Sequence, residues 1–381
     1  MTRRRRLCGL ALVVTLVTGA ISAGCSAAPP ERLRLVLGVN LELSGDGSSL
    51  GQAQRTALQL AVHNVQDSPR VSVLLAFRDN HSDADQARSI TENFLHDDTV
   101  SAIVGGSSAV TATAMAAASA AGGTNKPVML LASDAPTINA EQAQNVFAMT
   151  AGADIVADAL FAGLRLRGIK RVVALGSKDD YGQAGVAELK THGADFGITV
   201  ADAPGFSSEG KDLEQPVRAA TKDSANAVVV WSPRGIAATL ARQLHEARVS
   251  TQLYFAPGAG TQELAAEPGA DGASLVYPAI IAAGNTAATY PGALRQRQFL
   301  TDYRLRLGAL APELSASFDV VDLFVQVAHQ AHSVQSGRLR EQLKELSFEG
   351  FGGTYEFTST RHNGLARSSL VVTTLHGGAW S

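Results

Sequence analysis

Glycines, hydroxyl side chains and the start of a helix come together in the loop Gly105–Thr111. Glycine lets a backbone approach a ligand closely, and Ser107 and Ser108 stand just before a run that is typical of a helix, Val110–Ala121. Free N–H groups and hydroxyls at a helix start favour an anion such as a carboxylate, by up to about 2 kcal/mol when the site is partly buried. Alternatively, Ser107 or Ser108 only caps its own helix, although capping and ligand contact are compatible.

A second loop contains glycine and serine motifs that resemble those of enzymes. The stretch Gly47–Gly51 matches G-x-S-x-G, in which Ser49 would be a nucleophile on a sharp strand–Ser–helix turn. Ser49 lies nine residues past Asn40, where the first strand is predicted to end, so this turn is not expected. A dinucleotide fingerprint is also the wrong match, because three residues separate Gly47 from Gly51. We therefore expect no catalytic residue and no cofactor, with a secreted hydrolase that uses Ser49 as the alternative.

A predicted helix near the C-terminus, Leu314–Val334, carries polar side chains near one face. They are Asp319, Asp322, Gln326 and His329. One interpretation is a metal or proton-relay site, and the other is a solvated face opposite the apolar face of the helix. We favour the solvated face, and since no other cluster of histidine and acidic residues has metal-ligand spacing, we expect no metal.

Short apolar runs alternate with amphipathic stretches along most of the chain, in two successive series. Such alternation predicts parallel sheets with right-handed crossovers, and so an α/β fold of two doubly wound lobes. The predicted strands are Leu33–Asn40, Val71–Asp79, Val100–Val104, Pro127–Ala132 and Val146–Met149, then Arg171–Gly176, Gly197–Ala201, Ala227–Trp231 and Gln252–Ala256. The tail differs, with predicted helices Arg295–Leu307, Leu314–Val334 and Leu339–Leu346 and strands Gly353–Phe357 and Ser368–Thr374.

The first 25 residues have the pattern of an export signal. Arg3–Arg6 precede 17 uncharged residues, Leu7–Ala23, fewer than the about 20 that a membrane span needs. A basic start, a short apolar core and small residues at its end are typical of a signal peptide. The residues before Cys25 resemble the lipobox of bacterial lipoproteins, although Ser22 stands where leucine is usual. We predict lipidation at Cys25; an ordinary cleaved signal is the alternative, and the arginines also allow twin-arginine export.

Removal of residues 1–24 would leave a mature chain of 357 residues whose one cysteine is Cys25. An exported chain without disulfides must be held by its core, and this one is long enough for two domains. The signal contains four arginines and no acidic residue, so 28 Lys and Arg remain against 35 Asp and Glu, a net charge of −7. With no basic cluster left, we expect neither nucleic acid nor an anionic membrane surface as a partner, and the lipid would be the membrane anchor.

Five motifs follow one another in an order and spacing that resemble a known family. They are Leu43-Ser44-Gly45 after the first predicted strand, Phe77-Arg78-Asp79-Asn80, Val104-Gly105 with its hydroxyl loop, Asp180-Tyr181-Gly182-Gln183 with Gly185, and Phe348-Glu349-Gly350-Phe351-Gly352-Gly353. The chain resembles the type I periplasmic solute-binding proteins of ABC importers, more narrowly their leucine–isoleucine–valine binding branch. The resemblance covers roughly residues 33–375.

This resemblance implies two α/β lobes that are joined by three hinge crossovers and close over a ligand. The crossovers are expected near Met149–Gly152, Val276–Ala279 and Leu346–Glu349. The implied organisation is a signal peptide at 1–24, a lipidated tether at 25–32, a first lobe at 33–150 and 278–347, and a second lobe at 151–277 and 348–381.

The resemblance also implies ligand-binding positions. In amino-acid binders of the family, the loops after the third and fourth strands hold the α-carboxylate and α-ammonium. The matching residues here are Ser107, Ser108 and Ala109 in one loop, Ser133 and Asp134 in the other, with Tyr181, Trp231 and Gly258 from the second lobe. Surface packing of the two aromatic residues is the alternative to ligand contact.

One departure from the family concerns the ligand's ammonium group. The family often has an acidic residue after a proline, where this chain has Pro257-Gly258. Because a buried ammonium without a partner costs several kcal/mol, Asp134 would have to supply the charge. The alternative for Asp134 is an Asx turn before Pro136.

Together these features predict a lipid-anchored extracytoplasmic protein that is not an enzyme. It would be a monomer that delivers an amino acid, or an amide, urea-like molecule or aromatic acid, to the permease subunits of an ABC importer. The alternative is a sensor of the same fold that reports its ligand to a signalling partner.

Overall fold

The computed structural model describes residues 32–66, 68–135, 138, 142–222, 225–282, 294, 297, 301 and 314–380. The predicted signal peptide, Cys25 and most of the predicted helix Arg295–Leu307 lie outside these residues. None of the helices within them combines the length and apolar character needed to cross a lipid bilayer.

The first series of elements builds a five-stranded parallel sheet. Its strand order is β2-β1-β3-β4-β5, and every pairing between neighbours is parallel. Because side chains alternate across a strand, Leu35 and Leu37 join one core with α1, whereas Ile103 and Val128 join another with α2 and α3. The elements are β1 (Leu33–Leu41), α1 (Ser48–Val65), β2 (Val71–Asp79), α2 (Ala84–His96), β3 (Ala102–Gly105), α3 (Ala109–Ala121), β4 (Val128–Leu130) and β5 (Val146–Ala148).

The second series builds a sheet with the same strand order in its parallel part. The order is β14-β13-β10-β9-β8-β6-β7. Its parallel part, β7-β6-β8-β9-β10, repeats the order β2-β1-β3-β4-β5 of the first sheet. The elements are α4 (Ala153–Leu166), β6 (Arg171–Gly176), α5 (Asp180–Gly193), β7 (Thr199–Asp202), α6 (Glu214–Lys222), β8 (Ala227–Trp231), α7 (Ala237–Glu246), β9 (Gln252–Phe255), α8 (Gln262–Ala266) and β10 (Ser274–Pro278). Strand β10 and helix α8 were not predicted from the sequence.

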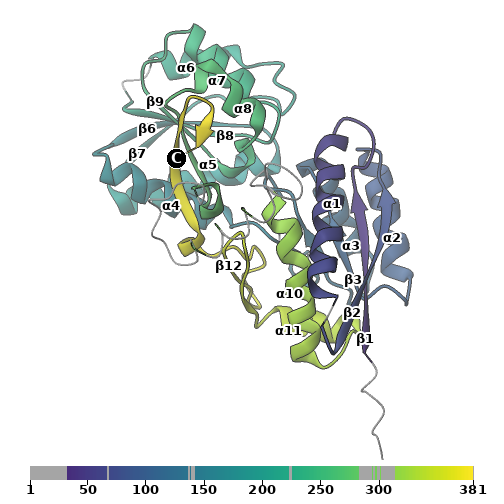
Figure 1. The fold of residues 1–381 in the computed structure, drawn as a ribbon. Helices are drawn as coiled ribbons and strands as arrows, with labels where there is room; N and C mark the ends of the chain where they lie inside the picture. The colour runs from purple at the N-terminus through teal and green to yellow at the C-terminus, as the bar shows by residue number, and fades with distance from the viewer. Residues whose placement is uncertain are drawn as a thin grey trace, which may run out of the picture. The chain divides into compact units, whose positions relative to one another are not determined.

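The C-terminal elements are shared between the two sheets. Helix α10 (Ser315–Ala331) packs against α1 and β1 of the first sheet and lies beside α1 in Figure 1. After α11 (Ser336–Leu343) and the hairpin β11 (Ser347–Glu349) and β12 (Thr354–Glu356), strand β13 (Leu370–His376) pairs antiparallel with β10, and β14 (Ala379–Trp380) pairs with β13. The chain therefore passes three times between the sheets, and the predicted fold of two doubly wound lobes is confirmed.

The predicted crossovers differ in how closely they coincide with the segments that pass between the sheets. Met149–Gly152 connects β5 to α4, and Val276–Ala279 includes the end of β10. The third predicted crossover, Leu346–Glu349, coincides with β11, and the later segment 362–365 runs beside the first crossover. There the N–H groups of Ala148 and Gly364 donate to the carbonyls of His362 and Ala148. The residue boundaries of the lobes stay a prediction.

Asp319 of α10 is the centre of the C-terminal packing. The interpretation of its helix face as solvated is wrong at this position, because Asp319 is 0% exposed. Its carboxylate accepts hydrogen bonds from the N–H of Phe351 at 2.6 Å and of Gly352 at 2.7 Å, and from the hydroxyl of Tyr355 at 2.9 Å. A Cβ on Gly350 would overlap this carboxylate, which explains the glycine at this position of the closing motif. Among the described residues, no group of three or more His, Cys, Asp or Glu side chains is arranged to hold a metal ion.

The burial of Asp319 predicts a pH-dependent stability. Burial raises the pKa of Asp319 to about 7, although its three hydrogen bonds act to lower the pKa. Since the unfolded carboxyl titrates near its ordinary value of 3.8, the folded state binds the proton more tightly. The stability from this group is therefore complete below about pH 4 and is lost as the pH rises through about 7.

Asn at position 319 cannot ionise. We therefore expect the unfolding free energy of wild type to fall relative to that of Asp319→Asn by about 1.4 kcal/mol per pH unit between pH 4 and pH 7. Urea denaturation of both proteins between pH 4 and pH 8 measures the difference. A difference in unfolding free energy that is constant, or that grows with pH, would contradict the assignment.

Candidate functional site

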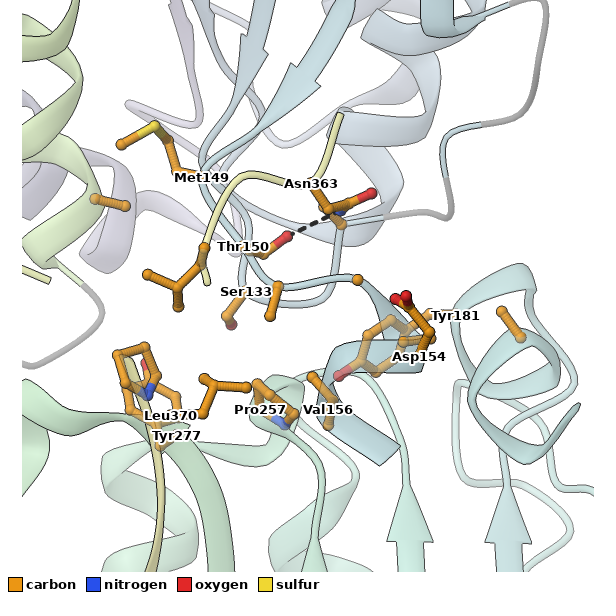
Figure 2. A pocket seen from close by; sticks show the side chains of 18 of the residues that line it. Ser133, Met149, Thr150, Asp154, Val156, Tyr181, Pro257, Tyr277, Asn363 and Leu370 are labelled. Carbon is orange, nitrogen blue, oxygen red and sulfur yellow. Dashed lines mark hydrogen bonds between the residues drawn. The ribbon is translucent and has the colours of Figure 1, made fainter. Parts of the chain in front are cut away.

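A cavity of about 180 Å³ opens where loops from both sheets and the start of α4 converge. Figure 2 shows Ser133 and Thr150 on one side of it, and Asp154, Tyr181 and Pro257 from the second series of elements. An engineered protein cavity of ~150 Å³ holds benzene. The space is therefore sufficient for a small organic molecule.

The walls of the cavity are mostly apolar. Aliphatic and aromatic side chains make up the larger part, namely Leu131, Met149, Val156, Tyr181, Trp231, Pro257, Tyr277, Tyr355, Leu365 and Leu370. The polar side chains in the lining are Ser133, Thr150, Asp154, Glu188, Ser315 and Asn363, and no described lining residue is a lysine, arginine or histidine. Apolar walls with a few placed polar groups are typical of small-molecule sites.

Several buried polar atoms beside the cavity have no partner within the described part of the chain. They are Ser133 Oγ and Asp134 Oδ1 after β4, and Trp231 Nε1 and Ser232 Oγ at the end of β8. Buried polar groups are almost always hydrogen-bonded, because an unsatisfied one costs about 1–3 kcal/mol. Their concentration at the carboxyl ends of two strands indicates a polar ligand or ordered water there.

Tyr181 holds one side of the cavity through its hydroxyl. Its oxygen accepts a hydrogen bond from the N–H of Gly258 at 2.9 Å, and its ring centroid lies 6.0 Å from that of Trp231. Burial raises the pKa of Tyr181 well above its usual value, so the hydroxyl stays protonated and has a hydrogen to donate. Gly258 has no room for a larger residue, since a Cβ there would lie 3.0 Å from both Asp134 and Tyr181.

The glycines of the Tyr181 motif bring α5 close to the sheet beneath it. A Cβ on Gly185 would overlap the indole of Trp231, and one on Gly182 would overlap Ser177. Trp231 is 1% exposed. The motif therefore fixes the position of the indole, which packs between α5 and the cavity.

Asp134 connects the loop after β4 with the loop after β8. It is 1% exposed, and its Oδ2 accepts a hydrogen bond from the backbone N–H of Arg234 at 3.0 Å. Burial raises the pKa of Asp134, and the nearby charge of Arg234 opposes that shift. Asp134 itself does not line the cavity, although Ser133 and Ala135 on either side of it do.

The loop Ser107–Ala109 holds an internal carboxylate. Ser108 caps α3 by accepting the N–H of Thr111 at 3.5 Å, and its hydroxyl donates to Glu42 Oε1 at 2.6 Å. The Thr111 hydroxyl donates to the same oxygen at 2.7 Å. None of residues 107–109 lines the cavity. The sequence reasoning missed Glu42, whose one signal is an acidic residue directly after a buried strand.

The predicted site residues thus fall into three groups. Ser133, Tyr181 and Trp231 line the cavity, and Asp134 and Gly258 lie directly behind it. Ser108 donates to Glu42, and Ser107 and Ala109 flank Ser108 in the same loop. Whether any of them binds a ligand stays a prediction.

Some lining residues were not predicted as site residues, although several of them lie in predicted crossovers. Thr150 lies in the predicted crossover and accepts a hydrogen bond from Asn363 Nδ2 at 3.2 Å (Figure 2). Tyr277 lies in another predicted crossover, Val276–Ala279, whereas Asp154 carried no comparable signal. Ser49 is exposed in the first turn of α1, and not on the sharp turn directly after a strand that a nucleophile elbow requires.

Solved structures share this fold at low sequence identity. Rp1789 of Rhodopseudomonas palustris CGA009 is 20% identical with a TM-score of 0.80, over 91% of this chain and 99% of that one. The leucine binding protein LivK of Thermotoga maritima is 19% identical with a TM-score of 0.76, over 91% and 97%. LivJ of Streptococcus pneumoniae, solved in complex with isoleucine, is 19% identical with a TM-score of 0.73, over 91% and 98%.

Sequence comparison gives the family. No curated protein sequence matches the chain significantly. The family described as periplasmic binding protein matches residues 35–379, a range that includes nearly all of both sheets and every described residue of the cavity. Since the match spans most of the chain, this protein belongs to the periplasmic binding protein family, as its ordered motifs indicated.

Proposed function

We propose that this protein is an extracytoplasmic solute-binding lipoprotein that delivers a small polar ligand, an amino acid or a small amide, to an ABC importer. The observation that carries the proposal is the cavity with its unpartnered polar atoms. Ser133 and Trp231 come from different lobes and both line a space of about 180 Å³, and their polar atoms Ser133 Oγ and Trp231 Nε1 are buried without a described partner. A ligand that bonds to both would hold the lobes together, and the closed form would be the one that the permease recognises.

The ligand class rests on size, wall chemistry and family. The apolar walls suit an aliphatic or aromatic side chain, and Ser133 with the protonated Tyr181 suits a polar head. LivK is named a leucine binding protein, and LivJ was solved with isoleucine. Their fold supports the proposal, and their ligands suggest where to begin a search. We assign the protein no catalytic residue, metal or cofactor.

A thermal-shift screen of the soluble domain from Ser26 onward, against amino acids, amides, urea analogues, aromatic acids and sugars, tests the proposal. A ligand at 100 times its dissociation constant stabilises the folded state by ~2.7 kcal/mol, which raises the melting temperature measurably. We expect a hit among the amino acids or amides. Ser133→Ala should weaken that hit roughly 3- to 10-fold, because one hydrogen bond contributes about 0.5–1.5 kcal/mol.

The matched control is Ser119→Ala. Ser119 is 1% exposed in α3 and its hydroxyl also has no described partner, but it does not line the cavity. Its replacement should leave ligand affinity unchanged. The proposal loses its basis if no compound shifts the melting temperature, or if Ser133→Ala binds the hit as wild type does.

The lipid anchor depends on Cys25. We expect the full-length protein to be found with the membrane fraction and to incorporate a labelled fatty acid. Cys25→Ser, which cannot carry a thioether-linked lipid, should abolish the labelling and leave the protein in an unlipidated form. Labelling that persists in Cys25→Ser would place the lipid elsewhere, and its absence from wild type would favour an ordinary cleaved signal.

A further inference from the structure

The strand order of the first sheet marks a place for a ligand. The order changes direction between β1 and β3, and in open α/β sheets ligands bind outside the carboxyl ends of the strands at such a point. Glu42 follows β1, and the loop Gly106–Ser108 follows β3 and starts α3. The hydroxyls and free N–H groups of a helix start favour an anion. An acidic group of a ligand would therefore be expected here.

The chain fills this place with a carboxylate of its own. Glu42 is 3% exposed, and its Oε1 accepts hydrogen bonds from the Ser108 hydroxyl at 2.6 Å and the Thr111 hydroxyl at 2.7 Å. Its Oε2 lies so close to the next loop that a Cβ on Gly47 would overlap it. The carboxylate thus lies between the hydroxyls at the start of α3 and Gly47, in the place where the anion of a ligand would be expected.

The charges around the cavity also disfavour an acidic group on the ligand. Asp154 and Glu188 are in its lining, and no described lining residue carries a positive charge. Behind the lining, His192 Nε2 lies 3.4 Å from Glu188 Oε2, and the charge of Arg234 acts on the buried Asp134. Asp154 is exposed and Glu188 is half-buried, so water weakens, without cancelling, the repulsion between these carboxylates and a ligand of like charge. A ligand carboxylate would therefore meet negative charge without a basic partner.

Resting on the proposed function, we infer that Glu42 is a specificity-determining residue and that the ligand is a carboxylate-free amide or amine with an apolar body. Glu42 supplies the anion that the start of α3 binds, and so excludes the acidic group of a ligand from that place. The polar head of the ligand would bond to Ser133 Oγ and the Tyr181 hydroxyl, and a cationic head would gain from Asp154, Glu188 and the aromatic walls.

Four matched probes test the inference by isothermal titration calorimetry on the wild-type protein: leucine, leucinamide, 3-methylbutylamine and 4-methylpentanoate. The inference predicts that leucinamide binds about tenfold or more tightly than leucine, a factor that corresponds to about 1.4 kcal/mol, and that 4-methylpentanoate does not bind. Leucine or 4-methylpentanoate binding more tightly than leucinamide overturns the inference and leaves the proposed solute-binding function intact.

A second measurement tests the role of Glu42 without any of the four probes. Glu42→Ala removes the carboxylate to which the Ser108 and Thr111 hydroxyls both donate. Sodium acetate should therefore raise the melting temperature of this variant more than the same concentration of sodium chloride does. Wild type and the double variant Glu42→Ala with Ser108→Ala should respond equally to the two salts. An equal response of Glu42→Ala overturns the inference. If none of the four probes binds, the proposed function is weakened and the acetate result alone decides the role of Glu42.

Discussion

Parallel strands end at one edge of a sheet, and the candidate site depends on this constraint. Each sheet has its parallel strands in the same order, with a change of direction between β1 and β3 and between β6 and β8. The loops that leave this edge bring together Glu42 with Ser108, Ser133 with Asp134, and Trp231 with Ser232. The three pairs are far apart in sequence, so the sheets bring their loops to one region, where the start of α4 and the segment 362–365 complete the cavity.

Buried carboxylates tie the loops to this framework, and each is held by neutral donors. Asp319 accepts two backbone N–H groups and a tyrosine hydroxyl, and Glu42 accepts two hydroxyls. Asp134 accepts a backbone N–H from the opposite lobe. Hydrogen bonds to an ionised group are about twice as strong as those between neutral groups, which offsets part of the cost of burial.

The sequence was sufficient for the elements with strong periodicity and not for those defined by distant partners. The strands at Leu33, Arg171 and Ala227 were predicted close to their observed ends, because buried parallel strands are short apolar runs. Strand β10 was missed since its run is short and ends at Pro278. Asp319 has the spacing of a solvated face, and only its contact with residues 351–355 shows that it is buried. For the same reason, Glu42 could not be recognised without α3 beside it.

Trp231 allows the most direct test of the central claim, that a small molecule binds in the cavity between the lobes. The chain has two tryptophans, Trp231 and Trp380, so Trp380→Phe leaves one tryptophan, which lines the cavity. Titration of this variant with a compound that binds by calorimetry should change the emission of Trp231. The change should saturate with the calorimetric dissociation constant. Binding that leaves this emission unchanged would contradict the account, because the ligand would then lie away from the cavity.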